Sequence, residues 1–204
     1  RLVDIFATKE SYFILFSTIA RLLISVGVSV VLGFLVFILV VWKKNIIYFL
    51  RPFLAITKTT PVAALIIILL IWFGAKYSPI IICIFVLFPL VVETLLLGLE
   101  RIDTSYIEEM QLNGQHFVYS LTHVYVPFVM PYFYMTLLQC LGLGMKVMVT
   151  SELISQTPNS IGLQMYHSKV YLDVPGLFAW TIVLIALVIV FEIFIQRMQK
   201  KIKT

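Results

Sequence analysis

An acidic segment near the middle of the chain carries residue types suited to recognising another protein. Ser105 and Glu108 have the spacing of a helix capping box, so a short helix is predicted to begin near Thr104. Gly114 can end this helix in a left-handed conformation that residues with a Cβ resist. The carboxylates of Glu108 and Glu109 would accept hydrogen bonds from basic side chains or backbone N–H groups. The alternative interpretation is a solvated helix face with no partner.

The chain then continues into a second short helix and a long apolar one. Four residues from Phe117 to Val124 form an apolar face at helical spacing. Pro127 suits the first turn of the long helix, where its missing N–H removes no hydrogen bond. Residues 103–126 are therefore predicted to form a helix–turn–helix segment that lies under a membrane and offers a surface to another molecule.

Charged residues inside apolar runs are candidates to line a path for a solute. Lys146 is flanked by Met145 and Val147, and a charge deep in a membrane is costly unless it faces water or a partner. Lys146 therefore either extends its ammonium group to the interface or lines a path that favours an anion. Glu152 lies nearer the end of the same run and is either a partner for Lys146 or a conformational support.

Pro89 and Glu93 form a similar pair in another apolar run. Pro89 is predicted to kink its helix, because proline removes a helical hydrogen bond and frees a carbonyl. Glu93, one turn later, either reaches the membrane interface, which is the favoured interpretation, or lies at an inner gate. Gly142 and Gly144 allow helices to approach closely, at a subunit interface or along a pore wall.

Residues for catalysis or metal binding do not form a recognisable pattern. His116, His123 and His167 have no plausible co-ligands, and Cys83 and Cys140 lack metal-type spacing and are interpreted as small apolar residues. A glycine-rich phosphate loop ending in Lys-Ser or Lys-Thr does not occur in the sequence, so the chain is not expected to bind ATP. We expect no metal, no cofactor and no enzymatic activity.

The elements that must position these residues are membrane helices. Of 204 residues, 61% are hydrophobic and 12% charged, and the mean hydropathy is +1.05. A soluble domain carries about 25% charged residues, and a membrane span needs roughly 20 apolar ones. The net charge of +5 does not indicate a nucleic-acid partner, because the basic residues gather at the ends of apolar runs.

One domain, residues 1–204, with five spans is predicted, the spans being at about 21–42, 61–75, 78–99, 127–150 and 176–195. Residues 1–20 are expected to form an interfacial helix, and residues 152–174 an external loop with a short helix near 163–171. Basic residues in the loop 43–60 and at the C-terminus place both in the cytoplasm by the positive-inside rule.

These motifs resemble those of binding-protein-dependent ABC importer permeases. Glu108-Glu109-Met110, Gly114 and Pro127 are similar to the "EAA" loop of that family: Glu-Ala-Ala, three residues, Gly, and Pro thirteen residues later. Glu109 and Met110 replace the two alanines. Further stretches resemble the nitrate/sulfonate/taurine branch of the family, namely Thr60-Pro61, Ile71-Trp72-Phe73-Gly74, Phe88-Pro89, Ser151-Glu152 and Ile161-Gly162-Leu163.

The resemblance implies an all-α type I permease fold with a cytoplasmic coupling helix, and one further membrane helix before Arg1. It implies a multi-pass protein of the bacterial cytoplasmic (inner) membrane. The implied partners are an ATPase dimer that binds the ATP, a second permease copy or a related permease, and an external substrate-binding protein. Contact with the ATPase would involve Glu108, Glu109, Gly114 and Pro127, and candidates for the translocation path are Lys146, Glu152, Glu93 and Pro89.

Two questions stay open at this point. The solute is either an anion such as a sulfonate or nitrate, as Lys146 suggests, or a small heterocycle such as a vitamin precursor. The second option rests on the aromatic external segment around Tyr166 and Tyr171. The alternative function is a secondary carrier or channel that needs no ATPase. A membrane-embedded enzyme would require a set of titratable residues that the sequence does not supply.

Overall fold

The computed structural model describes residues 1–103 and 116–202, and these residues form helices joined by short connections. In chain order the elements are α1 (Leu2–Ala7), α2 (Lys9–Trp42), α3 (Ile46–Thr59), α4 (Val62–Glu100), α6 (Phe117–Ser120), the π-helical turn η1 (Leu121–Tyr125), α7 (Val126–Ser155), α8 (Ile161–Val170) and α9 (Val174–Ile202). Within the described residues there is no strand, which confirms the predicted all-α class.

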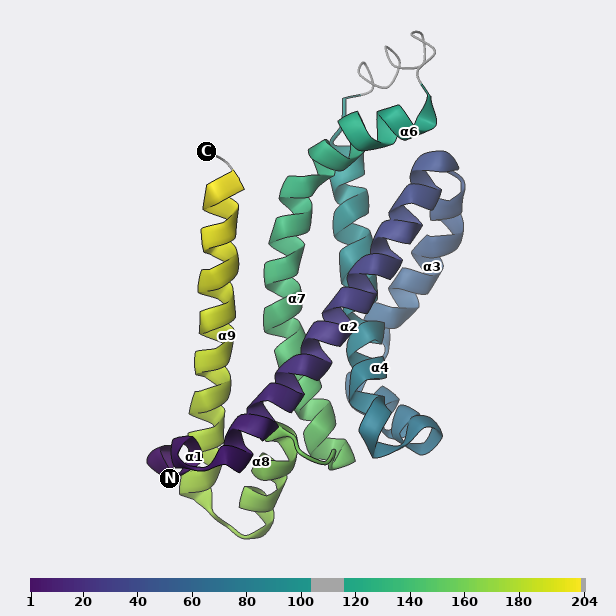
Figure 1. The fold of residues 1–204 in the computed structure, drawn as a ribbon. Helices are drawn as coiled ribbons and strands as arrows, with labels where there is room; N and C mark the ends of the chain where they lie inside the picture. The colour runs from purple at the N-terminus through teal and green to yellow at the C-terminus, as the bar shows by residue number, and fades with distance from the viewer. Residues whose placement is uncertain (104–115, 203–204) are drawn as a thin grey trace.

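The long helices form one bundle with two ends. Figure 1 shows α4 and α7 side by side, α2 crossing them diagonally, and α9 at one side. One end carries the last residue of α4, the short helix α6 and the C-terminus, and we call it the Glu100 end. The other carries the N-terminus, α8 and the last turn of α7, and we call it the Glu152 end.

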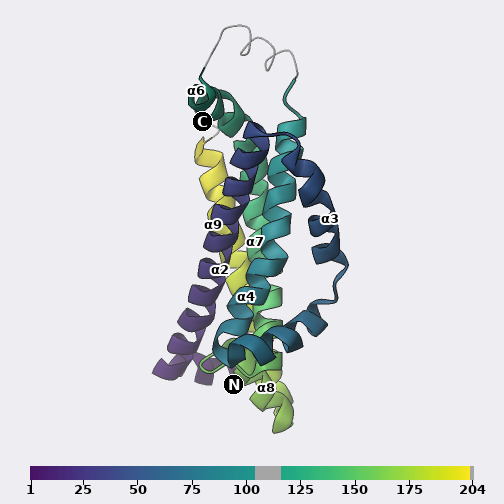
Figure 2. The same ribbon diagram turned by 90° about the vertical axis from the view of Figure 1, so that its right-hand side faces the viewer.

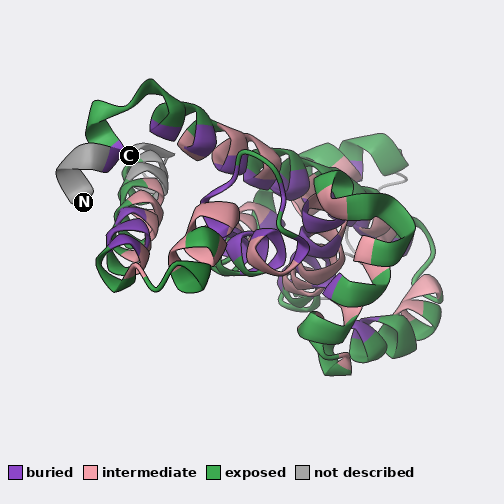
Figure 3. Ribbon diagram, turned by 90° about the horizontal axis from the view of Figure 1, so that it is seen from below, coloured by how far each residue is buried: buried purple, intermediate pink, exposed green. Residues whose placement is uncertain are grey.

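The bundle has the burial pattern of a membrane protein. Its core joins side chains from α2, α4 and α7, among them Phe37, Leu87 and Met148, and both predicted apolar cysteines are buried in it. Buried residues face the centre of the bundle, whereas the outward faces are exposed (Figure 3) and carry large apolar side chains such as Leu35 and Ile185. Apolar residues on both faces of a helix are typical of a membrane span.

Four helical segments among the described residues are long and apolar enough to cross a membrane, by length and composition: Lys9–Trp42, Val62–Glu100, Phe117–Ser155 and Val174–Ile193. The protein is therefore a multi-pass membrane protein. The predicted spans 61–75 and 78–99 correspond to two helical segments that meet at a kink. They belong to α4, which changes direction at Gly74 with φ 71° and ψ 171°, a conformation open to glycine but strained for other residues.

The segment 43–60 differs from the sequence prediction, because most of it is the helix α3 rather than a loop. Figure 2 shows α3 running beside the bundle from the Glu100 end, followed by residues 62–73 near the Glu152 end. Together they return the chain across the bundle, and residues 62–73 alone are too short to do so. Residues 1–20, predicted to form one interfacial helix, are divided between α1 and α2, because α2 already begins at Lys9.

Pro127 lies in the first turn of α7, as predicted. The helix does not stop before it but widens, since the N–H of Val126 donates to the carbonyl of Leu121 five residues earlier. Proline cannot donate to the preceding turn and crowds its carbonyl, and a π-helical turn relieves both conflicts. The expected apolar face is only partly buried: Leu121 packs against the core, whereas Phe117 and Val118 are 39% and 67% exposed.

Candidate functional site

The predicted coupling residues lie mainly outside the described part of the chain. This holds for Glu108, Glu109 and Gly114, which fall between its two described ranges. The helix α6 that follows is at the Glu100 end (Figure 1), and its side chains Phe117, Val118 and Tyr119 are exposed. Exposed aromatic and aliphatic side chains grouped at one end of a bundle provide a surface on which another protein can dock.

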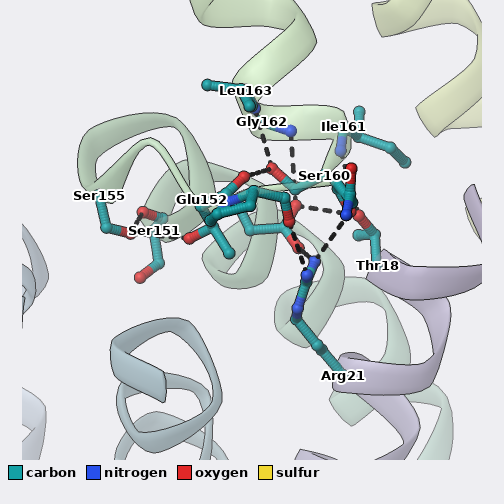
Figure 4. A network of polar contacts seen from close by, with 12 residues as sticks. Thr18, Arg21, Ser151, Glu152, Ser155, Ser160, Ile161, Gly162 and Leu163 are labelled. Atoms are coloured by element: carbon teal, nitrogen blue, oxygen red, sulfur yellow. Dashed lines mark hydrogen bonds and ion pairs between the residues drawn. The ribbon is translucent and has the colours of Figure 1, made fainter. Parts of the chain in front are cut away.

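Glu152 is fully buried at the other end of the bundle and is held by three donors (Figure 4). Nη1 of Arg21 donates to Oε1 at 2.9 Å, and Oγ1 of Thr18 donates to Oε2 at 3.1 Å. The backbone N–H of Gly162 also donates to Oε2, at 3.4 Å. A buried carboxylate is tolerable when charge and hydrogen bonds compensate it, and here both do.

The same contacts fix the loop between α7 and α8. Arg21 also donates through Nη2 to the carbonyl of Pro158 at 2.8 Å and through Nη1 to that of Asn159 at 3.3 Å. Ser160 caps α8, because its Oγ accepts from the N–H of Leu163 at 3.0 Å. The Glu152 carboxylate thus lies at the N-terminus of α8, where the helix dipole favours negative charge.

Gly162 allows α8 to approach α7 closely. A Cβ placed on Gly162 would lie 2.5 Å from the Cβ of Glu152 and would also meet the backbone N of Leu153. The motifs Ser151-Glu152 and Ile161-Gly162-Leu163 are therefore in direct contact. Of the two interpretations of Glu152, the structure favours the conformational support; its charged partner is Arg21 of α2 and not Lys146.

Lys146 lines a different feature, a groove of about 520 Å³ between α7 and α9 that also reaches Leu90 of α4. Four polar side chains share this groove: Gln139 and Lys146 from α7, and Glu192 and Gln196 from α9. Gln139, Lys146 and Gln196 are exposed, and Glu192 is half-buried.

Helical spacing and antiparallel packing bring these four side chains together. Gln139, Gly142 and Lys146 are three and four residues apart on α7, and Glu192 and Gln196 are four apart on α9, so each set shares one helix face. A Cβ on Gly142 would lie 3.8 Å from Oε1 of Glu192, which places the two helices in register.

The structure also separates the roles of the two glycines on α7. Gly142 lines the groove, whereas Gly144 packs in the core, where a Cβ would lie 2.9 Å from Cδ1 of Leu22. Leu87 of α4 lies on the same side of Gly144. The closely packed contact at Gly144 is thus made within this chain, between α7, α2 and α4.

The sequence interpretation missed Glu192 and Arg21. Glu192 lies between Phe191 and Ile193 in the predicted span 176–195, and a charge inside an apolar run is the same signal that identifies Lys146. The sequence places Arg21 only at the beginning of a span. Its partner is 131 residues away in the chain, and nothing in the spacing of the residues points to it.

Glu93 and Pro89 do not lie with Lys146 in this arrangement. Nζ of Lys58 on α3 lies 2.6 Å from Oε2 of Glu93. A second ion pair, of 3.8 Å, joins Arg51 to Glu100; on each helix its residue is seven positions from the residue of the first pair. These pairs connect α3 to α4. Pro89 is buried inside α4, directly before the groove residue Leu90. The path candidates Lys146, Glu93 and Glu152 therefore belong to three separate places in the described structure.

Comparison with known proteins agrees with this architecture. The family described as "Binding-protein-dependent transport system inner membrane component" matches residues 29–204. The chain is also similar to the formylaminopyrimidine transport permease protein ThiX of Halalkalibacterium halodurans, with 27% identity over 165 residues, which are 80% of this chain and 65% of the relative. The chain thus spans about two thirds of the length of that relative. Because the family match covers most of the sequence, this chain belongs to the binding-protein-dependent transport system inner membrane components.

Proposed function

We propose that this chain is the permease subunit of an ATP-driven importer, through which a small solute crosses the membrane while a separate ATPase supplies the energy. The observation that carries the proposal is the family match over residues 29–204, which includes the whole segment that resembles a coupling loop. A bundle with four candidate membrane helices supports it, as does a groove on the side of that bundle that carries four polar side chains.

Coupling to the ATPase is assigned to the Glu100 end. Glu108, Glu109 and Gly114 match the loop pattern in the sequence, and Pro127 begins the helix that follows. The exposed residues Phe117 of α6 and its neighbours extend the surface available to a partner. Such a contact transmits energy only if it differs between the two states of the ATPase, because equal binding to both shifts no equilibrium.

This assignment defines the orientation of the subunit in a bacterial inner membrane. The ATPase dimer lies in the cytoplasm beneath the Glu100 end, and the C-terminus is at the same end. The external binding protein then delivers solute at the Glu152 end. The buried Glu152 network holds α2, α7 and α8 in fixed positions there, and a second permease copy or a related permease completes the path.

The solute path is assigned to the groove that contains Lys146 and Glu192. Charged side chains in a membrane span are costly in lipid and are typical of substrate pathways. The similar protein ThiX is named a formylaminopyrimidine transport permease. This name favours, of the two candidate solutes, a small heterocycle over an anion such as nitrate.

Gly114→Val tests the coupling. The variant is expected to insert and to assemble with its ATPase, but ATP hydrolysis should no longer drive uptake. The measurement is solute uptake and ATP hydrolysis in vesicles that contain the complete transporter. Gly27→Val is the matched control, because Gly27 of α2 is exposed and a Cβ added there would meet no atom within 4 Å. Normal uptake by Gly114→Val would contradict the assigned role.

The rival function is a secondary carrier or channel. In that case the chain alone would move solute across vesicles without an ATPase and without ATP. We expect no uptake by the isolated chain and co-purification of a nucleotide-binding subunit. That subunit should be lost when residues 107–114 are replaced. If uptake persists without the ATPase, the protein is a carrier or channel and not an ATP-driven importer.

A further inference from the structure

We infer that the groove between α7 and α9 selects a small polar solute without net charge, either neutral or zwitterionic, rather than an anion. The inference rests on the proposed function, since it concerns the solute of the same path. Lys146 alone would favour an anion. The groove, however, contains a carboxylate as well as an ammonium group.

The first observation is the balance of charge. Of the polar side chains that line the groove, Lys146 is cationic, Glu192 is anionic, and Gln139 and Gln196 are neutral. An anion that binds beside Lys146 also faces the Glu192 carboxylate, which repels it. A solute with separated positive and negative groups, or with none, avoids this repulsion.

The second observation is the hydrogen-bonding capacity of the groove. Lysine contributes only donors, an ionised glutamate only acceptors, and each glutamine amide contributes both. A sulfate or nitrate ion contributes only acceptors and would leave the acceptors of Glu192 without partners. A heterocyclic amine or an amino sulfonate carries both kinds of group and can satisfy both sides of the groove.

The third observation concerns what fills the groove. Lipid chains would leave a lysine, a glutamate and two amides without partners in an apolar medium, which is unfavourable. The groove is open at the surface of this chain, and its volume of about 520 Å³ is large enough for a small molecule. Gly142 keeps the middle of the groove open, because it places no side chain in front of Glu192.

The test compares how fast charged reagents label a thiol placed in the groove. It uses the complete transporter with its ATPase, reconstituted in lipid vesicles. Cys83 and Cys140 are replaced by alanine, and a single thiol is introduced by Leu143→Cys, which leaves all four polar side chains of the groove in place. The thiol is then labelled with the anionic reagent sulfonatoethyl methanethiosulfonate and with the cationic reagent trimethylammonioethyl methanethiosulfonate.

Both reagents are expected to label the thiol. Glu192→Gln should raise the ratio of anionic to cationic labelling rates roughly tenfold, and Lys146→Met should lower it by a similar factor. The exposed residues Glu10 and Lys169 provide matched controls, and Glu10→Gln and Lys169→Met should leave the ratio unchanged. A thiol that neither reagent reaches, or a ratio that Glu192→Gln does not change, would overturn the inference. The first of these results would show that lipid or a second copy of the chain fills the groove.

Protection of the same thiol tests the solute class. Taurine as a zwitterion, cytosine as a neutral heterocycle, and ethanesulfonate as an anion are each added at millimolar concentration before labelling. Protection by taurine or cytosine but not by ethanesulfonate supports the inference. Protection by ethanesulfonate, with or without the others, or by none of the three, refutes it.

ATP hydrolysis and co-purification of the ATPase are measured in the same vesicles. If these fail, the proposed function fails as well; if they succeed while labelling and protection do not follow the expected pattern, only the inference is refuted.

Discussion

Nη1 of Arg21 lies 2.9 Å from Oε1 of Glu152, and this ion pair joins α2 to the last turn of α7 across 131 residues of sequence. Glu152 is fully buried and Arg21 nearly so, with side-chain exposures of 0% and 16%. The guanidinium group also binds the carbonyls of Pro158 and Asn159. One side chain therefore connects the first long helix, the α7 helix and the loop before α8.

Arg21→Met is predicted to destabilise the protein strongly. The substitution leaves the buried Glu152 carboxylate without its cation, and breaking a buried pair from one side costs about 3–5 kcal/mol. Thermal unfolding in detergent, followed by tryptophan fluorescence, should show a clear loss of melting temperature. Adding Glu152→Gln to the same chain should restore part of it, because no unpaired charge remains. A melting temperature equal to that of the exposed control Lys169→Met would disprove the role of the pair.

Gly162→Ala is predicted to displace α8 from α7. The added methyl group would overlap the backbone N of Leu153 and the Cβ of Glu152, and these atoms cannot move without shifting α7. Overpacking of this kind costs roughly 1–3 kcal/mol. Melting temperature and the rate of proteolysis between α7 and α8 measure the effect. Gly27→Ala is the control, because its new methyl group meets no atom within 4 Å and the same change should be neutral or stabilising there.

Thr157→Val is predicted to loosen the turn at Gly74. Pro79 has no N–H to donate to the carbonyl of Ala75 four residues earlier, and Oγ1 of Thr157 donates to this carbonyl instead, at 2.8 Å. Valine has a similar shape but cannot donate this hydrogen bond, and a typical hydrogen bond contributes about 0.5–1.5 kcal/mol. Amide hydrogen exchange in residues 74–78 should become faster. Thr59→Val, at an exposed position on α3, should leave exchange in this segment unchanged.

Lys58→Met, which breaks the ion pair with Glu93, is predicted to lower the stability of the protein only slightly if the pair lies at the membrane interface. Lys58 is 58% and Glu93 29% exposed, so if the pair lies at the membrane interface, Lys58→Met should cost no more than about 1 kcal/mol. A much larger loss would place Glu93 in the apolar interior, where an unpaired carboxylate is costly. Comparing the melting temperature of Lys58→Met with that of Lys58→Met/Glu93→Gln separates the two locations, because only the single variant leaves the carboxylate unpaired.

Local sequence signals predict those features that depend on neighbouring residues. Pro127 begins α7, and the short helix expected at 163–171 spans 161–170, because caps, prolines and helical spacing act within a few residues. The helical class follows from composition. The prediction of a loop at 43–60 is wrong, because the charges of Arg51 and Lys58 indicate solvent in the sequence, whereas in the structure they pair with Glu100 and Glu93 of α4.

Features that depend on distant residues could not be predicted in this way. A glycine between two apolar helices is compatible with a loop or with a bend, and only the backbone angles of Gly74 distinguish them. The motifs Ser151-Glu152 and Ile161-Gly162-Leu163 are only ten residues apart. Their contact nevertheless depends on Arg21, which lies in a different helix and holds the loop between α7 and α8. The partnership of Lys146 and Glu192 in one groove likewise requires the register of α7 against α9.

The buried contacts of Arg21, Thr157 and Gly162 all lie at the Glu152 end, whereas the pairs between α3 and α4 toward the Glu100 end join partly exposed side chains. If the proposed ATPase contacts the Glu100 end, a bundle fastened in this way would pivot about the Glu152 end. When a force acts at the opposite end, residues farther from the pivot are displaced farther. Glu192, at the level of Gly142, is farther from the pivot than Lys146 and would travel farther during each stroke.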